Sequence, residues 1–133
     1  MNTILIYESA GCSSCRKAKA WLEEKGLNYK TVNIFSKALT SKELKYLFSM
    51  SSDIYEVLSK RSTAVQNFKR IHGFEIEELS FNKLLDFIQK NPSALKRPLI
   101  TNGKILVSGY DEDEITALLP RHMRSCYPGR VIL

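Results

Sequence analysis

The chain has 133 residues, 44% of them hydrophobic, and a formal net charge of +6, a size that suffices for one domain with a substantial core. No apolar run approaches the length of a membrane-spanning helix, and the N-terminus has neither the basic region nor the cleavage site of a signal peptide. We therefore expect a cytoplasmic protein with no membrane association. The positive charge favours an acidic partner, such as nucleic acid or a protein that works on it, although many basic proteins bind no nucleic acid.

The first 26 residues predict a short strand, a loop and a helix. Residues 3–7 are aliphatic, β-branched and aromatic, as in a buried strand, and residues 9–11 are small and turn-forming. Apolar residues then recur at helical spacing, and Gly26 is expected to cap the end of the helix. Cys12 and Cys15 therefore lie at the start of the helix, where unpaired backbone N–H groups and the helix dipole favour a thiolate.

A CxxC pair between a strand and a helix is typical of a thioredoxin-like redox dithiol, because the first sulfur is activated and the second lies within reach. Two other interpretations stay open. A structural zinc site needs four ligands, and the further candidates occur singly, with no second CxxC: Cys126, His122 and His72. The cysteines could also be inert buried residues, since free cysteine is often buried.

Residues 29–35 predict a second strand, parallel to the first and joined to it through the helix. From about residue 36 to 91 the pattern is helical. Thr40 and Glu43 have the spacing of a capping box, residues 51–53 interrupt the pattern, and Ser80 caps a later helix. The apolar residues of this region are expected to face the core: Leu44, Leu47, Phe48, Ile54, Val57, Leu58, Val65, Phe68, Ile71, Leu84, Leu85, Phe87 and Ile88.

The last third of the chain returns to strands. Residues 97–100 and 104–107 predict two strands joined by a type I′ turn at Asn102-Gly103. The acidic run 111–114 is expected to begin a helix rather than to bind a metal, because acidic residues favour helix N-termini and apolar residues follow at helical spacing. Beyond that helix, residues 121–133 predict a basic tail without clear periodicity.

This order of elements predicts an α/β fold, a thioredoxin-like mixed sheet with an inserted helical region. We expect a single domain over residues 1–133. Its thioredoxin-like halves are expected at about 1–37 and 92–120, with the helical insertion at about 38–91.

Several motifs extend this prediction. They run from residue 3 to about residue 124 and include CSSCRKA at 12–18, WLEE at 21–24, NIFS at 33–36, RS at 61–62, KRPLI at 96–100, GYDEDEI at 109–115 and LPR at 119–121. In these motifs the chain resembles the ArsC/Spx family, and most of all its Spx-type redox-responsive transcriptional regulators from low-GC Gram-positive bacteria.

The resemblance implies a regulator rather than an enzyme, with no cofactor and no metal. Such proteins bind the C-terminal domain of the RNA polymerase α subunit, in a complex that can include promoter DNA, and are degraded by the ClpXP protease with an adaptor. The resemblance implies that a disulfide between Cys12 and Cys15 would then switch on thiol-stress genes. Oxidant would convert Cys12 to a sulfenic acid, with which Cys15 condenses. Arg97 is expected near the pair and linked to its oxidised form.

The resemblance places a polymerase interface around Tyr7, Ser49 and Ile54. The chain departs from the family pattern at the last two of these residues. The family has a glycine at the position of Ile54 and an arginine at that of Ser49. The C-terminus, residues 131–133, lacks the small polar ending of a degradation-prone member, although an apolar ending can also serve as a protease signal.

An enzyme of the same fold is the alternative. An arsenate reductase needs a thiolate, here Cys12, and arginines that hold the oxyanion, here Arg61 and Arg97. A third arginine is expected after the hairpin, yet none occurs from residue 104 to 119. A general thiol-disulfide oxidoreductase is also open.

Overall fold

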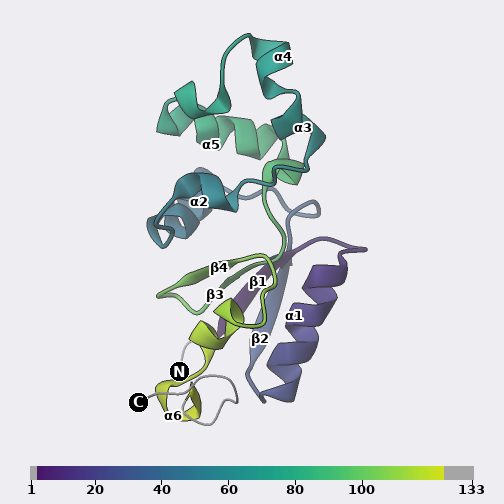
Figure 1. Ribbon diagram of the computed structural model, residues 1–133, viewed down its shortest axis with the longest axis vertical. Helices are drawn as coiled ribbons and strands as arrows, with labels where there is room; N and C mark the ends of the chain where they lie inside the picture. The colour runs from purple at the N-terminus through teal and green to yellow at the C-terminus, as the bar shows by residue number, and fades with distance from the viewer. Residues whose placement is uncertain (1–2, 125–133) are drawn as a thin grey trace.

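The computed structural model describes residues 3–124 and contains a four-stranded sheet with the strand order β2-β1-β3-β4 (Figure 1). β1 (Ile4–Glu8) is parallel to β2 (Tyr29–Asn33), and β3 (Leu99–Thr101) is antiparallel both to β1 and to β4 (Leu106–Ser108). The predicted mixed sheet is therefore confirmed, and the first strand begins one residue later than predicted. None of the helices within residues 3–124 is long and apolar enough to cross a membrane.

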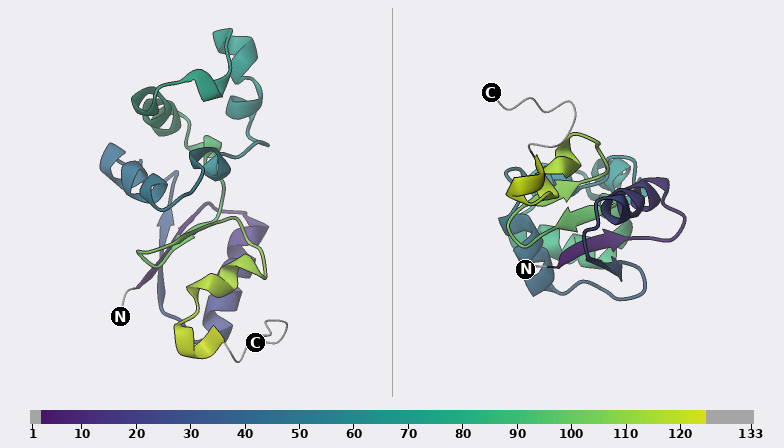
Figure 2. Two further views of the ribbon diagram at one scale, coloured as in Figure 1. Left: turned by 60° about the vertical axis from the view of Figure 1, so that its left-hand side comes forward. Right: turned by 90° about the horizontal axis from the view of Figure 1, so that it is seen from below.

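The side chains of β1 alternate between the two faces of the sheet, as strand geometry requires. Ile4 and Ile6 pack with the buried face of α1 (Ser13–Glu24), which lies alongside the sheet in Figures 1 and 2. Leu5 and Tyr7 face the opposite way and pack with the helices that follow β2. The sheet thus separates two apolar clusters, and β1 contributes to both.

The end of α1 follows the prediction that Gly26 caps it. Gly26 has φ +69° and donates its N–H to the Glu23 carbonyl at 3.1 Å, while Leu27 donates to the Leu22 carbonyl at 3.0 Å. These two bonds form a Schellman motif, whose left-handed residue is usually glycine because other residues are strained there.

β2 ends at Asn33, so the prediction of a strand to residue 35 is wrong by two residues. The Asn33 side-chain oxygen accepts the N–H groups of Phe35 at 2.9 Å and Ser36 at 3.1 Å. These bonds turn the backbone out of the sheet, which is a common role of asparagine.

Helical segments occupy the region between β2 and β3, as predicted, but each is short. They are α2 (Ser41–Ser49), η1 (Ile54–Val57), α3 (Thr63–Gln66), α4 (Phe68–His72), η2 (Ile76–Glu78), α5 (Phe81–Lys90) and η3 (Pro92–Ala94). They gather above the sheet in Figure 1. Thr40 and Glu43 form the predicted capping box, and the Ser80 hydroxyl accepts the N–H of Lys83.

One predicted core residue of this region is exposed. Ile71 was expected to continue the apolar face through Val65 and Phe68, yet its exposed fraction is 62%, whereas that of Phe68 is 3%. The prediction for Ile71 is wrong because α4 ends at His72, followed by Gly73 at φ +82°, so no continuous helix carries the periodicity across this stretch.

The predicted hairpin of β3 and β4 is present, but its two-residue type I′ turn is not. Thr101 pairs with Leu106, so the loop has four residues, 102–105. The Asn102 side-chain oxygen accepts the N–H groups of Lys104 and Ile105, and the Thr101 hydroxyl donates to the Ile105 carbonyl at 2.7 Å. These side-chain bonds stabilise the longer loop, so that the second strand begins at Leu106.

The acidic run begins a helix, as predicted, but the helix is a 3₁₀ segment, η4 (Glu114–Leu118). The Asp111 carboxylate accepts the N–H groups of Asp113 and Glu114 and satisfies the start of this segment. A short helix, α6 (Arg121–Arg124), follows where no element was predicted. The rest of the predicted basic tail, residues 125–133, lies outside the described residues.

Candidate redox site

Cys12 and Cys15 stand at the start of α1 as free thiols. Cys12 is the N-cap residue, and its sulfur accepts the backbone N–H of Cys15 at 3.2 Å. Cys12 is partly exposed, whereas only 1% of Cys15 is exposed. The two sulfurs therefore have different roles available to them, since only that of Cys12 can meet an oxidant from solvent directly.

The surroundings of Cys15 hold it in the protonated form. Burial raises the pKa of the Cys15 thiol from 9.0 to about 12, and a hydrogen bond with the Cys12 side chain and the charge of Glu8 act in the same direction. A backbone hydrogen bond at Ser9 acts in the opposite direction. A thiol of this kind suits a resolving residue, which reacts only once its neighbour has been oxidised.

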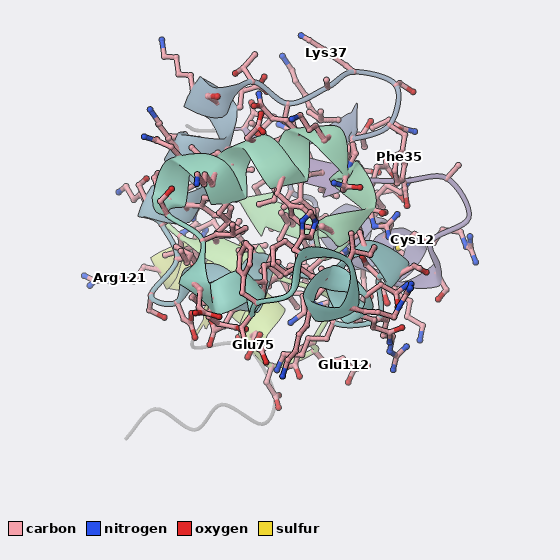
Figure 3. The ribbon with its side chains drawn as sticks, turned by 90° about the horizontal axis from the view of Figure 1, so that it is seen from above. Cys12, Phe35, Lys37, Glu75, Glu112 and Arg121 are labelled. Carbon is pink, nitrogen blue, oxygen red and sulfur yellow. The ribbon has the colours of Figure 1, made fainter. Side chains whose placement is uncertain are left out.

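Arg97 reaches the cysteine loop from the residues before β3. Its Nη1 donates to the Ser9 hydroxyl at 3.1 Å, and its guanidinium lies over the Phe35 ring, 5.2 Å from the centroid. The peptide bond between Arg97 and Pro98 is cis. Cys12 and Phe35 lie toward the same edge of the molecule in Figure 3. The cation–π contact and the hydrogen bond together fix the guanidinium beside the loop.

A hollow of about 690 Å³ opens between the cysteine loop, the segment before α3 and the segment before β3. Its cationic lining residues are Lys60, Arg61, Lys96 and Arg97, and Cys12 lies in the same wall. No carboxylate is among the described residues that line it. The structure thus brings together Cys12, Arg61 and Arg97, which the sequence predicted as a thiolate and two oxyanion-binding arginines. It adds Lys60 and Lys96, for which the sequence predicted no role.

An ion pair that the sequence did not predict joins α1 to β1 near the cysteines. The Lys19 ammonium, on α1, lies 2.7 Å from a carboxylate oxygen of Glu8, the last residue of β1. The signal was available, because Glu8 shares the α1-facing side of β1 with Ile4 and Ile6, where a charged residue needs a partner.

The three residues suggested for a polymerase interface do not share one environment. Tyr7 is buried, and burial followed by the charge of Glu43 raises the pKa of its phenol. Ser49 is exposed at the end of α2, and Ile54 is half-buried against the core of the helical region. The Tyr7 side chain is therefore inaccessible to a partner here, while the other two are reachable.

Within residues 3–124, no group of three or more His, Cys, Asp or Glu side chains is placed to hold a metal ion. His72 and His122 lie on two different short helices, α4 and α6. Cys126, the remaining candidate for the zinc interpretation, lies outside the described residues.

Comparison with known proteins identifies the family. The ArsC family profile matches residues 7–118. The chain belongs to the ArsC family. A member from Listeria innocua, named Global transcriptional regulator Spx, is 42% identical over 123 residues, which cover 92% of this chain and 91% of that protein. A protein of the same name from Staphylococcus aureus is 42% identical, over 92% of this chain and 91% of its own length. One from Enterococcus faecalis is 40% identical, over 91% of this chain and 89% of its own length.

Solved structures of the ArsC family and its relatives have the same fold. An arsenate reductase from Vibrio cholerae has a TM-score of 0.76 at 18% identity, over 89% of this chain and 98% of that one. A Staphylococcus aureus protein solved by NMR has a TM-score of 0.75 at 22% identity, over 86% and 97%. At these identities the likeness concerns the fold alone, and it confirms the predicted thioredoxin-like ArsC architecture.

Proposed function

We propose that this chain is a redox-responsive transcriptional regulator of the Spx type, switched by a disulfide between Cys12 and Cys15. The observation that carries the proposal is the pair itself: a partly exposed sulfur at the N-cap of α1 accepts the backbone N–H of Cys15, whose own thiol is buried one turn later. The relatives named Global transcriptional regulator Spx, at 42% identity over 92% of the chain, support the regulatory role.

The chemistry of the switch needs only the two cysteines and a peroxide. The Cys12 thiolate attacks a peroxide oxygen, the O–O bond breaks, and Cys12 becomes a sulfenic acid while the other oxygen leaves as water after protonation. The Cys15 sulfur, after losing its proton, attacks the Cys12 sulfur and displaces hydroxide, which leaves as water. The two electrons that reduce the peroxide come from the two thiols.

The partner we propose is the C-terminal domain of the RNA polymerase α subunit, in the cytoplasm, in a complex that can include promoter DNA. Ser49 and Ile54 offer the accessible surface for this contact. Tyr7 would take part only indirectly, by packing under that surface. Turnover by the ClpXP protease with an adaptor is part of the same proposal, and its suggested signal at residues 131–133 lies outside the described residues.

Intact-mass spectrometry tests the switch. Mild peroxide is expected to remove two hydrogen atoms from the monomer, and dithiothreitol is expected to restore them. A Cys12→Ser variant should show no such loss, whereas Cys126→Ser should behave as the wild type. Oxidation that yields only intermolecular dimers through Cys126 would contradict the proposal.

A second candidate function rests on the basic hollow. Cys12, Arg61 and Arg97 line one cavity, which is the arrangement that an arsenate reductase uses to bind an oxyanion beside a thiolate. Incubating the reduced protein with arsenate and measuring its free thiols separates the two functions. We expect no arsenate-dependent loss of thiols. A loss that Arg61→Ala abolishes would make the reductase the better account.

A further inference from the structure

We propose that the ion pair between Glu8 and Lys19 sets the rate at which Cys15 attacks Cys12, by balancing the charge beside the buried thiol. This inference rests on the proposed disulfide switch. It assigns Glu8 and Lys19 as positioning residues for a step that neither of them touches chemically.

The pair is built into the layer between β1 and α1. Glu8 follows Ile4 and Ile6 on the side of β1 that packs against α1, and its side chain is 15% exposed. Lys19 comes from α1, its side chain is 30% exposed, and the two charged groups are 2.7 Å apart. Such a half-buried pair is screened less by solvent than the exposed pairs elsewhere on the chain.

Helix geometry puts this pair next to the resolving cysteine. Lys19 follows Cys15 by four residues on α1, and residues at this spacing are neighbours on one face of a helix, with Cβ atoms about 5–6 Å apart. Glu8 is also close enough for its charge to raise the pKa of Cys15. The Glu8 carboxylate disfavours the Cys15 thiolate. From its place one turn further along α1, we infer that the Lys19 ammonium acts in the opposite direction and favours it.

The rate of closure depends on this balance because Cys15 must lose its proton before it can attack. At neutral pH the Cys15 thiol is almost entirely protonated, so the rate follows the small thiolate fraction. Removing Lys19 leaves the Glu8 charge unbalanced beside Cys15, and closure slows. Removing the Glu8 charge leaves the ammonium unbalanced, and closure speeds up.

A merely structural ion pair gives a different outcome. Either single substitution breaks the same 2.7 Å contact between β1 and α1. If the contact only held the two elements together, both variants would change the closing rate in the same direction, or both would leave it unchanged. The opposite signs are therefore the signature of the electrostatic role.

Ellman's reagent, an aromatic disulfide, isolates the closing step. Cys12 attacks it, forms a mixed disulfide and releases one nitrothiobenzoate thiolate. Cys15 then attacks the Cys12 sulfur, forms the internal disulfide and releases the second thiolate, whose absorbance gives the closing rate. All proteins carry Cys126→Ser, so that a third thiol adds no signal.

We expect Lys19→Met to slow the second release about three-fold and Glu8→Gln to speed it about three-fold, as a partly screened charge near the thiol predicts. The double variant, Glu8→Gln with Lys19→Met, should return close to the wild-type rate, and Lys19→Arg should keep it. Lys17→Met, which removes an exposed lysine of the same helix, controls for net charge. Circular dichroism shows whether each variant is folded.

Each outcome bears on one proposal or on both. If the wild type releases no second thiolate, the disulfide switch is overturned and this inference falls with it. If the wild type closes while Lys19→Met and Glu8→Gln change the rate in the same direction, or leave it unchanged, the inference alone is overturned.

Discussion

At the scale of single residues, the two cysteines differ more than their sequence spacing suggests. Cys12 caps a helix and reaches solvent, whereas Cys15 lies one turn further on and is buried. The CxxC pattern alone indicates a dithiol, but it is the burial that assigns the order of reaction. In the proposed switch, the exposed sulfur would meet the oxidant first, and the buried sulfur would resolve the product.

Alkylation tests this order directly. At pH 8, iodoacetamide is expected to modify Cys12 readily and Cys15 hardly at all, because burial holds the pKa of Cys15 near 12 and little thiolate is present. Peptide mass spectrometry locates the label. Equal labelling of both residues, in protein that circular dichroism shows to be folded, would contradict the assignment.

The raised pKa of Cys15 also makes stability depend on pH. The folded state keeps the Cys15 proton that the unfolded chain loses above its ordinary pKa of 9.0. Its contribution is therefore fully present below about pH 9 and is lost as the pH rises toward 12. We expect urea unfolding to show the wild type losing more stability than Cys15→Ala between pH 8 and pH 10. Parallel losses in the two proteins would argue against the shift.

Arg97 and Phe35 form the other residue-scale unit. Arg97→Ala removes a cation that is held beside the cysteine loop, and it should slow alkylation of Cys12 by a few-fold, because a positive charge favours a thiolate. Phe35→Leu should give part of that effect, since it removes the ring that holds the guanidinium. Phe35→Tyr is the matched control and should react as the wild type does. An unchanged rate in Arg97→Ala would mean that the arginine is structural.

At the scale of elements, local signals predicted helix ends better than strand ends. The capping box at Thr40 and Glu43 and the glycine cap at Gly26 both depend on residues within one turn, so the sequence contains all that decides them. The last residue of β2 and the first residue of β4 depend on backbone N–H groups that donate to the side-chain oxygens of Asn33 and Asn102, respectively. An asparagine followed by a turn does not reveal from sequence which of several turns it will stabilise.

The capping box gives a prediction at this scale. Thr40→Ala is expected to lower the free energy of unfolding by about 1 kcal/mol, because it leaves the N–H of Glu43 without its partner at the start of α2. Chemical denaturation measures the change. Ile71→Ser, at an exposed position of α4, is the control and should change stability by less than about 0.5 kcal/mol. Equal effects of the two substitutions would contradict this account of α2.

At the scale of the whole molecule, the basic hollow joins segments that are distant in sequence. Cys12 comes from the first loop, Arg61 from the segment before α3 and Arg97 from the segment before β3. Spacing along the chain cannot bring these residues together, so their place beside the cysteines followed only from the family resemblance. Lys60 and the Glu8–Lys19 pair, which no motif contains, emerged only from the fold, as did the place of Lys96 in the lining of the hollow.

The folded molecule also determines which residues of the helical region are available as a docking surface. Ile54 stands where the family pattern has a glycine. It is the half-buried first residue of η1, so it offers a partner a bulky apolar group. A group of this kind can anchor an interface or obstruct it. We expect binding to the polymerase domain to persist, because Ser49, the last residue of α2, remains exposed.

Isothermal titration calorimetry with the isolated C-terminal domain of the RNA polymerase α subunit tests the central claim most directly. The protein is titrated in its reduced form and after peroxide has closed the disulfide, with Ile54→Gly measured in parallel. The account predicts saturable binding of the wild type, and binding at least as strong for Ile54→Gly. No binding in either redox state, by the wild type or by Ile54→Gly, would contradict the regulator and favour the oxidoreductase.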